Sequence, residues 1–118
     1  MSKPSLQKSF GYAFRGIGIM ILSERNFQIH LLALFINLLL IIVLQLNRDD
    51  AVIIIIVSTI VLITEMLNTC IEKICDFIHP EFNLNIGRIK DISAGAVLVA
   101  SMAALVTAVL IYGKYLKL

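Results

Sequence analysis

Three runs of mostly apolar residues constrain the fold of this chain more than any other feature. They are Ile29–Leu46 with 18 residues, Ala51–Ile63 with 13 and Ile92–Tyr112 with 21. The only polar side chains in the first run are those of His30, Asn37 and Gln45. Because an α-helix rises about 1.5 Å per residue, roughly 20 apolar residues cross the hydrocarbon core of a bilayer. The runs therefore predict membrane-spanning segments.

The composition agrees with a membrane protein and excludes several other classes. Hydrophobic residues make up 59% of the 118 residues, whereas a soluble domain averages about 45–50%. The net charge of +2 is small and dispersed, and without a basic run or an aromatic RNA-binding motif the chain is not expected to bind nucleic acid. Cys70 and Cys75 would point about 140° apart on a helix, which favours neither a disulfide nor a metal pair. The mixed polar segment Ser5–Phe14 is not a secretory signal.

The segments between the runs predict how the helices connect. The isoleucine- and valine-rich run Ala51–Ile63 has strand propensity. A helix is nevertheless expected, because a segment in lipid must pair all of its backbone polar groups through its own hydrogen bonds. The polar turn Asn47–Asp50 predicts an antiparallel return. Pro80 disfavours helix in the residue before it and should end the second span. Asn37, in the middle of its run, is expected to bond to a neighbouring helix.

We therefore predict an all-α integral membrane protein, forming one domain over residues 1–118. It has an N-terminal amphipathic surface helix at about 3–23, with apolar residues at helical spacing and basic residues opposite. Three spans follow at about 29–46, 51–68 and 92–112, and a polar connector at 81–91 precedes the last. With the N-terminus in the cytoplasm, seven basic residues lie inside and three outside. The positive-inside rule thus favours a multi-pass protein of the inner (cytoplasmic) membrane in this orientation.

The acidic end of the second span carries the strongest functional signal. At about 100° per residue, Glu65, Glu72 and Asp76 fall within about 20° of one line on a helix, and Asn68 flanks it. Ionisable groups in membrane segments are candidates for functional sites. The stripe Thr64–Asp76 therefore requires a cation, a proton relay or a basic partner.

Phosphoryl transfer is one chemistry that these residue types support. Carboxylates with asparagine suit Mg²⁺, Lys90 and Arg88 suit phosphate, and a carboxylate free of metal can accept a proton from a hydroxyl. Metal, phosphate cradle and base are the parts that phosphoryl transfer needs. The chain has no P-loop and no protein-kinase motif, which excludes the usual soluble nucleotide-binding folds.

Structural interpretations exist beside the functional ones. Asp76 suits a solvated helix face, Glu72 a surface pair with Lys73, Lys90 a positive-inside anchor and Glu24 a charge at the start of the first span. The polar face of the N-terminal helix is either solvated or binds an anionic ligand through Lys8, Tyr12 and Arg15. At the level of the whole protein, the alternatives are a small oligomeric channel or proton-coupled transporter that uses Glu65, and a structural membrane partner.

Two patterns together resemble the prokaryotic diacylglycerol kinase family, which includes small integral-membrane diacylglycerol kinases and undecaprenol kinases. The first is EMLNT at 65–69, followed by Ile71, Glu72 and Asp76. The second is GRIKD at 87–91, followed by SAGAV at 93–97. The resemblance runs from about Phe10 to the third span.

The resemblance implies a homotrimer with active sites between protomers, where the γ-phosphate of ATP passes to a lipid alcohol at the cytoplasmic interface. By match of motif, Glu65 resembles the general base, with Asn68 beside it. Glu72 and Glu24 resemble the ligands of the Mg²⁺ that carries ATP. The nucleotide and phosphate residues implied are Lys90, Asp91, Asp76, Tyr12 and Arg15.

The segment after Glu24, RNFQIH, bears on the lipid substrate. It resembles the corresponding stretch of undecaprenol kinases rather than that of enterobacterial diacylglycerol kinases. The resemblance therefore favours undecaprenol over diacylglycerol, with a role in cell-wall lipid carrier or phospholipid metabolism. It identifies no residues that contact the lipid.

Overall fold

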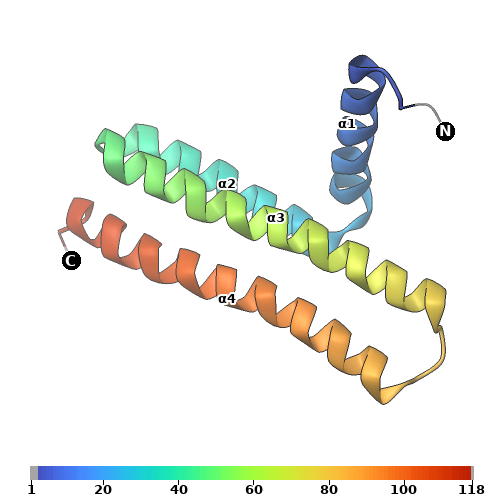
Figure 1. Ribbon diagram of the computed structural model, residues 1–118. Helices are drawn as coiled ribbons and strands as arrows, with labels where there is room; N and C mark the ends of the chain where they lie inside the picture. The colour runs from blue at the N-terminus through green and yellow to red at the C-terminus, as the bar shows by residue number, and fades with distance from the viewer. Residues whose placement is uncertain (1–2, 118) are drawn as a thin grey trace.

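The computed structural model describes residues 3–117, and this part of the chain is built from α-helices joined by short links (Figure 1). The helices are α1 Leu6–Ser23, α2 Arg25–Val43, α3 Arg48–Ile78 and α4 Leu84–Tyr115. The predicted all-α class is confirmed. By length and composition, α2, α3 and α4 can each cross a membrane, which agrees with the three predicted spans.

The N-terminal helix stands apart from the other three. Ser5 caps α1, because its side-chain oxygen accepts a hydrogen bond of 3.3 Å from the backbone N–H of Lys8. Glu24 alone separates α1 from α2, with an extended backbone (φ −109°). The chain therefore bends sharply, and α1 projects away from the long helices (Figure 1). The predicted helix is confirmed, beginning at Leu6 rather than at residue 3.

The helix α3 is central to the bundle, with α2 and α4 packed against it (Figure 1). One stripe along α3 is buried and recurs at helical spacing; its members are Asp50, Ile54, Ser58, Val61, Glu65, Asn68, Thr69 and Cys75. Most apolar side chains of α2 and α4 are exposed in the isolated chain. This distribution suits helices whose outer faces contact lipid or other helices.

A hydrogen-bonded chain in mid-bundle joins all three long helices. Asn37 donates from Nδ2 to Ser58 Oγ at 3.2 Å, and the Tyr112 hydroxyl donates to Asn37 Oδ1 at 2.8 Å. The predicted bond from Asn37 to a neighbouring helix is therefore confirmed. Such interhelical bonds in membranes contribute about 0.6 kcal/mol on average, and here they also fix the register of α2 against α3.

Helix caps place three boundaries differently from the sequence-based bounds. α2 ends at Val43 rather than Leu46, because the chain turns at Gln45 in the left-handed region (φ 53°). Asn47 accepts a 2.9 Å bond from Asp50 N, so α3 already begins within the predicted turn. Asn83 accepts bonds from two backbone N–H groups in the next three residues. Most of the predicted connector 81–91 is consequently the first part of α4.

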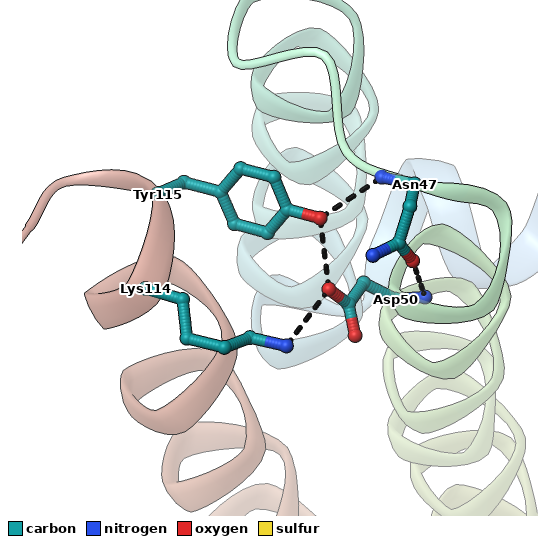
Figure 2. A network of polar contacts seen from close by, with 4 residues as sticks. All are labelled: Asn47, Asp50, Lys114 and Tyr115. Carbon is teal, nitrogen blue, oxygen red and sulfur yellow. Dashed lines mark hydrogen bonds and ion pairs between the residues drawn. The ribbon is translucent and has the colours of Figure 1, made fainter.

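Four residues form a polar cluster where α3 begins and α4 ends, here called the Asp50 cluster: Asn47, Asp50, Lys114 and Tyr115 (Figure 2). Asp50 Oδ2 accepts from Lys114 Nζ at 3.0 Å and from the Tyr115 hydroxyl at 2.8 Å. The same hydroxyl accepts from Asn47 N at 2.9 Å. The cluster fastens the α2–α3 turn to the end of α4.

Candidate active site

The C-terminal half of α3, here called the Glu65 end, holds the acids singled out from the sequence. Glu65 is buried, with 4% of its surface exposed. The electrostatic surroundings of its carboxylate include His30 and Asn26 from α2 and two further acids, Glu72 and Glu24. The carboxylate therefore lies inside the α2–α3 packing, among like charges.

Asn68 lies one helical turn beyond Glu65 and is also buried. Its Nδ2 donates to Glu72 Oε1 at 3.1 Å, as the four-residue spacing on one helix allows. Its Oδ1 is buried without a hydrogen-bond partner among residues 3–117. A buried acceptor left unpaired costs about 1–3 kcal/mol. The arrangement therefore offers an oxygen to a ligand.

Glu24 reaches the same end of α3 from the junction of α1 and α2. Its Oε1 lies 3.8 Å from Lys73 Nζ, so both predicted metal ligands, Glu24 and Glu72, belong to this end of the bundle. In the described chain, no group of three His, Cys, Asp or Glu side chains is arranged to hold a metal ion. Mg²⁺ bound with a nucleotide needs fewer protein ligands, because it is held by one or two carboxylates, phosphate oxygens and water.

The third feature of the site joins α3 to α4. The ammonium group of Lys90 donates a hydrogen bond to the Asp76 carboxylate and forms an ion pair with it. This bond raises the pKa of Lys90, which precedes the span expected at 92–112. Lys90 also lines a pocket of about 180 Å³ beside the α3–α4 link, together with His79, Asn83 and Gly87. A charged amine beside open space suits an anion.

Three predicted residues are not brought to this site by contacts within one chain. The Arg15 guanidinium stacks over the Tyr12 ring, 5.6 Å from its centroid. Both side chains are exposed on α1, which packs mainly on α2. Asp91 is exposed as well, because neighbouring helix positions point about 100° apart. No hydrogen bond or ion pair between described residues links these three to Glu65, Glu72 or Lys90.

A comparison with known families identifies the chain. The family model described as prokaryotic diacylglycerol kinase matches residues 11–112. The chain belongs to this family. The resemblance noted in the sequence is thereby confirmed, and the matched segment contains all nine predicted site residues: Tyr12, Arg15, Glu24, Glu65, Asn68, Glu72, Asp76, Lys90 and Asp91.

Relatives in the prokaryotic diacylglycerol kinase family carry two different names. The diacylglycerol kinase of Synechocystis sp. is 33% identical over 104 residues, covering 87% of this chain but only 59% of the relative. That of Escherichia coli K12 is 30% identical over 100 residues, covering 85% and 82%. The undecaprenol kinase of Bacillus subtilis is 33% identical over 105 residues, covering 89% and 85%. These identities do not separate the two lipids named.

Sequence reasoning missed two neighbours of Glu65, namely His30 and Asn26. In the sequence, His30 is a polar interruption of the first apolar run, and both residues belong to the RNFQIH segment, but neither position indicates a contact with Glu65. A signal for it does exist, because His30 precedes Asn37 by seven residues and Glu65 follows Ser58 by the same number. This equal spacing of seven residues indicates a contact between His30 and Glu65 only when the contact between Asn37 and Ser58 is known.

Proposed function

We propose that this chain is a membrane lipid kinase that transfers the γ-phosphate of ATP to the hydroxyl of a lipid alcohol at the cytoplasmic membrane interface. Family membership and the names of the relatives, diacylglycerol kinase and undecaprenol kinase, support a lipid kinase. The structural observation that carries the proposal is the buried Glu65 on a helix able to cross a membrane, one turn from Asn68 and its unpaired acceptor.

Glu65 is proposed as the general base. Its carboxylate accepts the proton of the lipid hydroxyl, the hydroxyl oxygen forms a bond to the γ-phosphorus, and ADP leaves with the bridging oxygen. Glu65 makes no ion pair with a lysine or arginine among the described residues, unlike Glu24 and Asp76. Its burial excludes water, so a hydroxyl delivered from the bilayer has little competition for the carboxylate.

Glu24, Glu72 and Asn68 are proposed to hold Mg²⁺. Their donor atoms are all oxygens, as Mg²⁺ prefers, and the unpaired Oδ1 of Asn68 provides a neutral one. When bound, Mg²⁺ would neutralise charge on the phosphates. The existing bond from Asn68 to Glu72 keeps two of these side chains oriented.

The nucleotide is proposed to bind towards the α3–α4 link. Lys90, now paired with Asp76, would turn its ammonium to the phosphates, and Asp76 and Asp91 would assist. Tyr12 and Arg15 are proposed to contact the nucleotide from α1. Because the contacts within one chain do not bring them to the site, we propose a homotrimer whose sites form between protomers. The exposed apolar faces of α2 and α4 support such packing.

Undecaprenol is proposed as the preferred substrate. The inner membrane is proposed as the location, with the N-terminus in the cytoplasm. The RNFQIH segment after Glu24, which resembles that of undecaprenol kinases, supports the substrate. The seven-to-three distribution of basic residues supports the orientation.

A phosphate-transfer assay tests the proposal. The purified protein in lipid–detergent micelles receives γ-³²P-labelled ATP with Mg²⁺ and either undecaprenol or a diacylglycerol, and the lipid products are separated. Label is expected in both lipids, more in undecaprenol, and in neither when a chelator removes Mg²⁺. Absence of label from both lipids, in protein that remains folded by circular dichroism, would contradict a lipid kinase.

A further inference from the structure

The predicted spans contain a titratable side chain that the proposed reaction leaves unused. Within residues 29–46, 51–68 and 92–112, the titratable side chains are His30, Glu65 and Tyr112. The Tyr112 hydroxyl is occupied, since it donates to Asn37, and Glu65 is the proposed base. His30 remains, and an ionisable residue within a membrane segment points to a function because its placement costs free energy.

The register of α2 against α3 places His30 opposite Glu65. The bond from Asn37 to Ser58 fixes one level at which the two helices meet. The two helices run antiparallel. Moving seven residues towards the N-terminus of α2 and seven residues towards the C-terminus of α3 therefore reaches another pair of residues that face each other. Seven residues are close to two turns, which returns both side chains to the same faces, about 10 Å from the Asn37–Ser58 bond. His30 and Glu65 are the residues of that pair.

A cavity supports the same placement. His30 and Val61, which lies one turn before Glu65 on α3, both line a cavity of about 280 Å³ between the three long helices. Small side chains such as Ala33 and Ala104 leave this space open. The imidazole therefore stands at the interface of α2 and α3, next to the turn that carries the carboxylate.

The surrounding charges favour His30 as a partner of Glu65. Around this carboxylate, His30 is the basic side chain and Glu24 and Glu72 are acidic, while Asn26 is a neutral hydrogen-bond partner. No titratable residue occurs in α3 between 51 and 64 or in α4 between 92 and 111. Lys73 faces Glu24 instead. An imidazole N–H is a suitable donor to a carboxylate and fixes its orientation.

We propose that His30 is a positioning residue for Glu65: its imidazole N–H orients the buried carboxylate, so that the other carboxylate oxygen faces the hydroxyl of the lipid. The inference rests on the proposed function, because only a kinase reaction uses Glu65 as a base. His30 acts through Glu65 and touches neither ATP nor the metal.

A matched pair of variants tests the kinetic consequence. Leucine and glutamine are both close to histidine in size, but only glutamine keeps an N–H donor. His30→Leu is expected to lower kcat for lipid phosphorylation about ten- to a hundredfold, as the loss of a charge-assisted hydrogen bond does. The KM for Mg·ATP should not change, and His30→Gln should recover most of the loss. Wild-type kcat in His30→Leu would overturn the inference, as would an equal loss in both variants.

Infrared spectroscopy tests the contact without any turnover. The carboxylate stretching band of Glu65 is identified by its absence in Glu65→Gln. It is expected to shift in His30→Leu and to stay in place in Ala104→Val, a control that alters the same cavity from α4. An unshifted band in His30→Leu would overturn the inference even if the kinase is active. A shifted band in a protein that phosphorylates no lipid would support the contact and remove the proposed function.

Discussion

The two polar ends of α3 are made from similar residues but are completed differently. In the Asp50 cluster, the carboxylate accepts bonds from Lys114 and Tyr115, and Asn47 caps the helix (Figure 2). At the other end, Glu65 is buried among further acids, and Asn68 keeps a buried oxygen without a partner in the described chain.

The difference lies in the supply of donors. At the Asp50 end, α4 brings one lysine and one tyrosine to one acid, so the carboxylate finds its hydrogen-bond donors within the same chain. At the Glu65 end, the lysines that reach the acids pair with the outer ones, Glu24 and Asp76. Buried acids and an unpaired amide oxygen lower stability unless a ligand completes them. We infer that the Asp50 cluster serves the fold and that the Glu65 end serves function.

The largest expected effect follows from removing the base. Glu65→Gln keeps the size of the side chain but cannot take the proton, so lipid phosphorylation should fall about 10²- to 10⁴-fold. The melting temperature should stay the same or rise, because one of several neighbouring acids becomes neutral. The measurements are the phosphate-transfer assay and thermal unfolding in micelles.

The matched control is Asp50→Asn, which also neutralises a buried acid of α3. It should keep its activity and lose stability, the reverse of Glu65→Gln. Should Glu65→Gln retain most of the wild-type rate, Glu65 would not be the base and the contrast between the two ends would fail.

A smaller effect is expected at the metal. Glu72→Gln removes one of two proposed anionic ligands, so the free Mg²⁺ concentration for half-maximal activity should rise roughly tenfold. Titrating Mg²⁺ at constant ATP measures this. Asp49→Asn, an exposed acid in the first turn of α3, is the control and should titrate like the wild type. An unchanged Mg²⁺ dependence in Glu72→Gln would rule out its role as a ligand.

The spacing of the acids predicted their common face, but not their differing burial. Glu65 is buried, Glu72 is half-buried and Asp76 is exposed. With 31 residues, α3 is about 46 Å long, which exceeds the roughly 30 Å hydrocarbon core. The acids on its face therefore lie at different depths and in different environments. Their angular spacing in the sequence does not predict how burial decreases from Glu65 to Asp76.

Contacts between distant segments could not be predicted from hydropathy. The pairs His30 with Glu65 and Asp76 with Lys90 depend on the register of one helix against another. An apolar run predicts that a helix packs against another, but it does not determine the axial position or the rotation of one helix relative to the other. Even Asn37 was expected only to find some partner, and the structure identifies Ser58 and Tyr112 as its partners. Such pairings become predictable once one interhelical contact is known.

The smallest expected effect is a pH dependence of stability at the Asp50 end. Hydrogen bonds from Lys114 and then Tyr115 lower the pKa of Asp50, which precedes the span expected at 51–68. A carboxyl whose pKa is depressed by folding stabilises the protein above its unfolded pKa of about 3.9. That contribution is lost as the pH falls through the lower folded value. Asp50→Asn should therefore melt below the wild type at pH 7, and the gap should narrow towards pH 3.

Thermal unfolding of both proteins in micelles between pH 3 and 7 measures the gap, and Asp49→Asn should show none at any pH. A gap of equal size across the whole range would mean that packing, rather than the charge of Asp50, holds this end together. The narrowing of the gap would instead show that Asp50 is stabilised in its ionised form by its own chain. Glu65 differs from Asp50 in this respect, because it forms no ion pair with a lysine or arginine among the described residues.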